Sequence, residues 1–143
     1  MLADAMNQTA ISAALLAFLN SGDHLLMVDT VYWPVRHLCD TVLKRLGIET
    51  TYYDPMVGKN ITALMQPNTR VVYCECPGSQ TMEMQDVPAL AKAAHEGGAI
   101  VMVDTTWSAG YYFKAFEHGC DVSVQAATKY ITGHSDAMLG TVV

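Results

Sequence analysis

Hydrophobic residues follow two kinds of pattern along this chain, one typical of helices and one typical of buried strands. Ile11, Leu15 and Leu19 recur at helical spacing, and so do the apolar residues of 33–46, where Gly47 is placed to end a helix. Short continuous apolar runs such as 99–103 predict strands that are buried on both faces. We therefore predict helices near 11–19, 33–46, 60–65 and 87–96, and strands at 24–28, 50–53, 71–75, 100–104, 122–126 and 138–143. Their alternation predicts an α/β fold with a mostly parallel sheet flanked by helices.

The predicted sheet also indicates where functional residues should lie. In parallel sheets of this kind, ligands bind just beyond the carboxyl ends of the strands. That rule selects four places in the chain, which are 29–32, the residues from Glu75 onward, 104–107 and 127–129. We expect the chemistry of the protein at this edge.

Two residues at these places are unusual for their surroundings. Asp104 ends a strand of four apolar residues, where burial raises the pKa of a carboxyl unless a cation holds it ionised. Lys129 follows another strand, and desolvated lysines form Schiff bases. Pyridoxal phosphate needs both a lysine and an acid at its ring nitrogen, and Tyr32 and Thr128 would supply a stacking face and a phosphate contact. Each residue also has an ordinary interpretation, since Asp104 would serve as a local cap and Lys129 as a solvated surface charge.

Composition excludes several other classes of protein. Hydrophobic residues make up 51% of the 143 residues and charged residues 15%, which excludes a disordered chain. The net charge of −6 and the scattered Lys and Arg residues argue against a nucleic-acid partner. The longest apolar stretch is about half of the ~20 residues that cross a bilayer, so we expect no membrane association and a cytoplasmic location. The four cysteines lack metal-ligand spacing, so we predict reduced thiols and no metal site.

Longer motifs around these residues carry a family resemblance. Val122-Ser-Val-Gln-Ala-Ala-Thr-Lys-Tyr-Ile-Thr-Gly-His-Ser-Asp136 and Val101-Met-Val-Asp-Thr-Thr-Trp107 resemble the core of the Cys/Met-metabolism family of pyridoxal-phosphate enzymes. Cys76-Pro-Gly-Ser-Gln-Thr-Met-Glu83, with Asp86-Val-Pro88, is most similar to the cystathionine β-lyase branch. The resemblance covers nearly the whole chain and implies the large domain of fold-type I enzymes.

The resemblance implies a role for each site residue. Lys129 would form the covalent link to pyridoxal 5'-phosphate and then move the substrate proton, and Asp104 would pair with the pyridine nitrogen. Tyr32 would stack on the ring and assist proton transfer, and Thr128 would bind the phosphate. Gln8, with Asn7, stands where relatives have a glycine-containing phosphate turn, and we expect Gln8 to contribute a backbone N–H there. Ala126 stands where many relatives have a phosphate-binding serine.

The implied reaction is an α,β-elimination that converts cystathionine, an amino-acid thioether, into homocysteine, pyruvate and ammonia. Residues 1–143 would form the middle of the large domain, without counterparts of the family's N-terminal arm and C-terminal domain, in a subunit that forms a homotetramer at full length. Three alternatives stay open. They are a cystathionine or methionine γ-lyase, a fragment without activity, and a non-catalytic α/β module that binds a partner through exposed apolar surface.

Overall fold

The chain forms one sheet with helices on both of its faces. This computed structural model describes residues 2–143, with the side chains of 8–143. The α-helices are α1 (Leu2–Phe18), α2 (Trp33–Leu38) and α3 (Val87–Glu96); η1 (Cys39–Leu43) is a π-helical continuation of α2, and η2 (Gly58–Leu64) and η3 (Ala115–His118) are 3₁₀ helices. The strands are β1 (His24–Val28), β2 (Glu49–Tyr53), β3 (Thr69–Glu75), β4 (Ile100–Asp104), β5 (Val122–Gln125) and β6 (Thr141–Val142).

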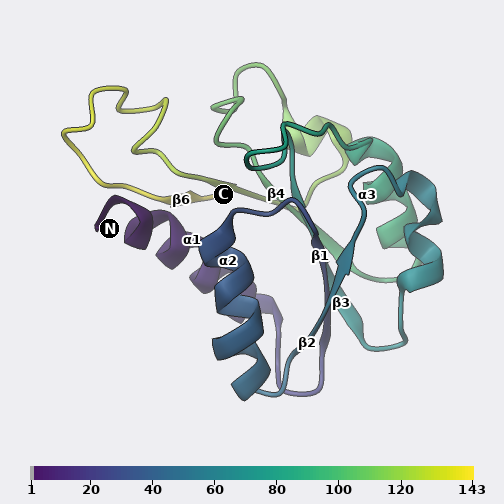
Figure 1. Cartoon of the computed structure of the whole chain (residues 1–143). Helices are drawn as coiled ribbons and strands as arrows, with labels where there is room; N and C mark the ends of the chain where they lie inside the picture. The colour runs from purple at the N-terminus through teal and green to yellow at the C-terminus, as the bar shows by residue number, and fades with distance from the viewer. Residues whose placement is uncertain (1) are drawn as a thin grey trace.

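The described strands lie in the order β2-β1-β3-β4-β5-β6. Neighbouring strands from β2 to β5 pair in parallel, and β6 pairs with β5 in the antiparallel sense. This arrangement confirms the predicted mostly parallel α/β sheet. The chain leaves β1 toward one side for β2 and then returns to the other side for β3 (Figure 1). The carboxyl ends of β1 and β3 therefore flank a topological switch point, where ligands of such sheets bind.

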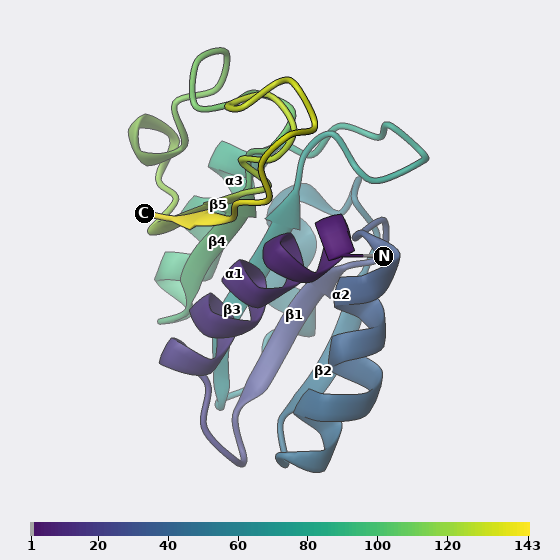
Figure 2. The ribbon, with the colours of Figure 1, turned by 90° about the vertical axis from the view of Figure 1, so that its left-hand side faces the viewer.

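The helices form two layers around the sheet. Helices α1 and α2 cover one face, and α3 packs on the opposite face against β4 and η2 (Figure 2). The core between the layers is apolar and contains fully buried residues from every long strand, among them Leu26, Val72 and Val103. Helix α3 begins where the sequence indicates, because the Asp86 carboxylate accepts the backbone N–H of Ala89 and caps the helix.

Several elements differ from their predicted extent or helix type. Helix α1 begins at Leu2, well before the predicted start at Ile11, because the preceding residues include the good helix formers Ala and Met. The predicted helix over 33–46 contains the π-helical segment η1. Strand β6 covers two residues of the predicted 138–143, since Leu139 bonds to a loop outside the sheet. None of the described helices is long and apolar enough to span a membrane.

Candidate functional site

The candidate site is a cavity at the carboxyl edge of the sheet. Its volume is about 580 Å³, and small-molecule sites have volumes of roughly 300–1,000 Å³. Residues at or after the ends of β1, β3, β4 and β5 line it, and these are the four places that the sequence selects. The lining residues are Tyr32, Glu75, Ser79, Asp104, Thr106, Trp107, Ala126, Thr128, Lys129, Tyr130, Gly133, Ser135, Ala137 and Met138.

Two acidic side chains lie next to each other on the cavity wall. Glu75 ends β3 and Asp104 ends β4, and the two are register partners, so their side chains share one face of the sheet. Both are buried, with exposed fractions of 4% and 5%. The Asp104 carboxylate accepts the backbone N–H of Thr106 at 2.8 Å, which fixes it at the start of its loop. Burial, followed by the charge of Asp104, raises the pKa of Glu75 from 4.5 to about 7.

The Glu75 carboxylate connects two loops of the cavity wall. Its Oε2 atom accepts the backbone N–H of Tyr32 at 3.0 Å, and its Oε1 atom accepts the hydroxyl of Ser79 at 2.5 Å. These bonds lower the pKa of Glu75, although less than burial raises it. Tyr32 is half-buried, directly precedes α2 and lines the cavity. Its position is therefore tied to the end of β3.

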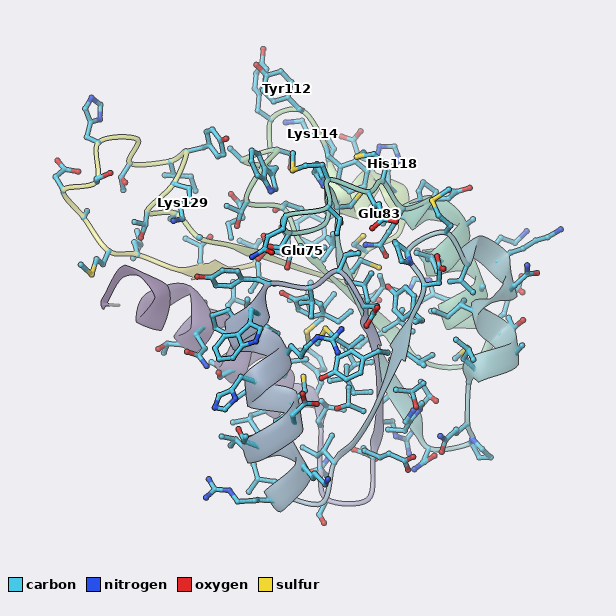
Figure 3. The ribbon with its side chains drawn as sticks, in the orientation of Figure 1. Glu75, Glu83, Tyr112, Lys114, His118 and Lys129 are labelled. Atoms are coloured by element: carbon cyan, nitrogen blue, oxygen red, sulfur yellow. The ribbon has the colours of Figure 1, made fainter. Side chains whose placement is uncertain are left out.

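Lys129 brings an amine to the same cavity. It lies in the loop after β5, where its backbone N–H donates to the Ala126 carbonyl at 2.8 Å. Figure 3 shows Lys129 and Glu75 at the same edge of the sheet, on separate segments of the chain. Its side chain is exposed, and within residues 8–143 no carboxylate forms an ion pair with it. Within the described residues the amine of Lys129 is therefore open to water, unlike a desolvated lysine.

Thr128 has a structural task in addition to its place in the cavity. Its hydroxyl accepts the backbone N–H of Leu139 at 2.8 Å and donates to the Leu139 carbonyl at 3.3 Å. The Thr128 backbone N–H donates to the same carbonyl at 3.0 Å. To bind a phosphate, Thr128 would have to turn its hydroxyl proton away from Leu139.

Gln8 is the predicted site residue that does not line the cavity. Its side-chain amide donates to the Pro34 carbonyl at 3.3 Å, which ties α1 to the start of α2. Both Gln8 and Asn7 lie within α1 and not in a turn before it, so the backbone N–H of Gln8 points along the helix to the preceding turn. The structure therefore does not bring Gln8 to the other predicted site residues.

A second cavity of about 630 Å³ opens at the same edge but offers different chemistry. Its lining includes Asp29, Asp54, Glu83 and Arg36. Arg36 is already paired with the Asp29 carboxylate and stacked 3.8 Å from the centre of the Tyr52 ring. Because this cavity lacks a lysine among its described lining residues, we take the cavity around Lys129 as the candidate site.

The sequence predicts a functional place at Glu75 but indicates no role for it. The available signal was the same as for Asp104, because Glu75 also follows a run of apolar residues at the end of a strand. Two aromatic residues were also missed, Trp107 and Tyr130, whose ring centres lie 6.0 Å apart on the cavity wall. Among the described residues, no three His, Cys, Asp or Glu side chains group as metal ligands.

Comparison with known proteins identifies the family. The family described as Cys/Met metabolism PLP-dependent enzyme matches residues 2–143. The chain belongs to this family. Among its relatives, the cystathionine beta-lyase of Escherichia coli K12 is 50% identical over 136 residues, which are 94% of this chain and 34% of that protein. The cystathionine gamma-lyase of Bacillus subtilis is 36% identical over 134 residues, which are 94% of this chain and 35% of that protein.

A solved structure shares the fold of this chain. The cystathionine gamma-lyase of Lactobacillus plantarum, complexed with L-serine, matches with a TM-score of 0.92 and 30% identity. The match covers 96% of this chain and 36% of that one. The chain spans about a third of the length of the relatives it matches.

Proposed function

We propose that this chain forms the cofactor-binding part of a carbon–sulfur lyase that performs α,β-elimination on cystathionine. The observation that supports this proposal is the meeting of Lys129, Asp104 and Tyr32 in one cavity from three separate loops. The relatives named cystathionine beta-lyase, at about half identity, favour this reaction. The less similar relative named cystathionine gamma-lyase keeps the γ-elimination as a second candidate.

The residues of the cavity fit pyridoxal phosphate. The primary amine of Lys129 suits the aldehyde of the cofactor, and the buried carboxylate of Asp104 suits its basic ring nitrogen. Aromatic side chains of the cavity suit its flat ring. Hydroxyl groups of Thr106, Thr128 and Ser135 lie in the same wall, but no guanidinium lies among the described lining residues. We propose that Lys129 and Asp104 hold the two ends of the cofactor ring and that Tyr32 covers one face.

The chain's own residues would then divide the work of the reaction. Pyridoxal phosphate, when bound, supplies an aldehyde and an electron-accepting ring. Lys129 Nζ would take the proton from the substrate Cα. Asp104, which is buried, would hold the ring nitrogen in its protonated form, and Tyr32 would hold the ring plane and assist proton transfer. Breakage of the Cβ–S bond would release homocysteine, whose sulfur takes up the proton held by Lys129. With one water, the remaining three-carbon amine fragment would leave as pyruvate and ammonia.

Borohydride reduction in the presence of pyridoxal phosphate tests this assignment. We expect a covalent adduct on Lys129 by peptide mass spectrometry and its loss in Lys129→Ala. Lys114→Ala is a matched control, because Lys114 is exposed and donates to the Gly110 carbonyl at 2.8 Å. An adduct that persists in Lys129→Ala would refute the role of Lys129. No adduct in the unchanged protein would favour the non-catalytic module.

Product analysis separates the two candidate lyases. The β-lyase forms pyruvate from cystathionine, whereas the γ-lyase forms 2-oxobutyrate.

We also propose the wider setting of this activity. The family indicates a small amino-acid substrate, and a thioether is the form that a carbon–sulfur lyase requires. We propose a cytoplasmic homotetramer in which residues 1–143 belong to the cofactor-binding large domain. Light scattering on the protein that carries this chain would measure the number of subunits.

A further inference from the structure

Glu75 is a buried acid at the candidate site to which the reaction above gives no task. Asp104 faces it from β4, and the loops after β1 and β3 face it with a backbone N–H and a hydroxyl. Tyr73 lies two residues earlier on the same face of β3, with a buried phenol. Within residues 8–143 no cation forms an ion pair with Glu75. An unpaired carboxyl this deeply buried costs stability, so its presence calls for a function.

The contacts of Glu75 all lead toward Tyr32. One carboxylate oxygen holds the Tyr32 backbone, and the other holds Ser79. The backbone N–H of Ser79 in turn donates to the Thr30 carbonyl at 2.9 Å, two residues before Tyr32. Gly78 allows this close approach, because a Cβ atom there would lie 2.4 Å from Thr30 Oγ1. The loops after β1 and β3 are thus joined around a single carboxylate.

We propose that Glu75 is a positioning residue, which fixes the backbone of Tyr32 and thereby sets where the Tyr32 ring lies on the cofactor. The inference rests on the proposed function, because it assigns the ring of Tyr32 to pyridoxal phosphate. Glu75 itself needs no contact with the cofactor. Its task is to accept two hydrogen bonds at a defined place, and a negative charge is not essential for that.

Two substitutions separate the hydrogen bonds from the charge. Glu75→Gln keeps an oxygen that accepts the Tyr32 N–H, and its amide donates to Ser79 once that hydroxyl has turned. Glu75→Met has a similar size but accepts neither bond, so Tyr32 loses its anchor without a cavity in the core. Glu83→Gln is the matched control, because Glu83 lies in the loop that follows β3, is exposed and lies outside the candidate site (Figure 3).

The first measurement needs no cofactor. Hydrogen exchange at the Tyr32 amide should be at least about tenfold faster in Glu75→Met, which corresponds to ~1.4 kcal/mol of lost protection. Exchange in Glu75→Gln and Glu83→Gln should stay within about threefold of the unchanged protein. Unchanged exchange in Glu75→Met would overturn the inference. If Glu75→Met does not fold, Ser79→Ala replaces it, with about threefold faster exchange expected and no change contradicting the proposal.

The second measurement uses the protein loaded with pyridoxal phosphate. Glu75→Met should bind the cofactor about tenfold more weakly and change its visible circular dichroism, because the ring of Tyr32 is no longer held in place. Glu75→Gln should restore both readouts, whereas equal losses in Gln and Met would show that charge is required and would overturn positioning. If the unchanged protein binds no cofactor, the proposed function fails, and the exchange result still decides whether Glu75 holds Tyr32.

Discussion

Replacement of Glu75 by glutamine should change how the stability of the protein depends on pH. The folded protein keeps the Glu75 proton up to about pH 7, whereas the unfolded chain releases it near 4.5. Between these values the folded state binds the extra proton, so its stability falls as the pH rises. Each tenfold difference in proton affinity corresponds to about 1.36 kcal/mol, so the ionised carboxyl costs about 3 kcal/mol of unfolding free energy above pH 7. Glu75→Gln removes this cost.

The measurement is urea unfolding of both proteins at pH 5 and pH 8. We expect the advantage of Glu75→Gln over the unchanged protein to be larger at pH 8 by about 2.5 kcal/mol, because the unfolded chain is already partly ionised at pH 5. The comparison cancels other groups that titrate in this range, because they are present in both proteins. Glu83→Gln, at an exposed position in the loop after β3, is the control for replacing a glutamate by glutamine. The reasoning is refuted if the advantage of Glu75→Gln is the same at both pH values.

Three further predictions concern buried parts of the fold. Tyr53→Phe should lower the free energy of unfolding, measured in urea, by about 1–3 kcal/mol, because its buried hydroxyl lies 2.9 Å from the Tyr73 carbonyl and from Gln85 Oε1. Tyr112→Phe, at an exposed position, should have no effect in the same measurement. Gly78→Ala should lower the free energy of unfolding by about 1–3 kcal/mol, measured by thermal unfolding, because the new methyl group overlaps Thr30. An unchanged melting temperature would contradict the close approach of Gly78 and Thr30. Burial lowers the pKa of His24 below 6.5, so the unfolded chain binds a proton more readily than the folded protein, and stability should fall as the pH drops below 6.5. Urea unfolding at pH 5.5 and 7.5 should show a smaller fall in the free energy of unfolding for His24→Gln than for the unchanged protein.

The sequence predicts those elements best whose signals are local. Strands β1 and β4 and helix α3 lie where the apolar runs and the Asp86 cap place them. The four loops of the cavity follow from the same information, because parallel strands bring their carboxyl ends to one edge. The sequence therefore predicts one site for Lys129, Asp104, Tyr32 and Thr128, and all four line the cavity.

Other features depend on contacts between distant parts of the chain, which a local pattern does not contain. Gln8 was expected in a turn near the phosphate, but α1 continues through it and its amide bonds to Pro34. The end of the chain forms a shorter strand than predicted, because Leu139 bonds to Thr128. The role of Glu75 depends on Tyr32 and Ser79, and the bond to Tyr32 crosses 43 positions of the sequence. Hydrogen bonds of this kind are decided by how the loops meet.

The chemistry at the edge of the sheet depends on apolar residues deep inside it. Val71 and Val72 of β3 pair with Ile100 and Val101 of β4, and this register continues to the pair of Glu75 and Asp104. Because side chains alternate between faces, a shift of β4 by one residue would turn Asp104 away from the cavity and place an apolar side chain there. The buried runs therefore hold an acid within reach of the cavity that Lys129 lines. Substitutions that loosen this pairing should affect cofactor binding without touching the site.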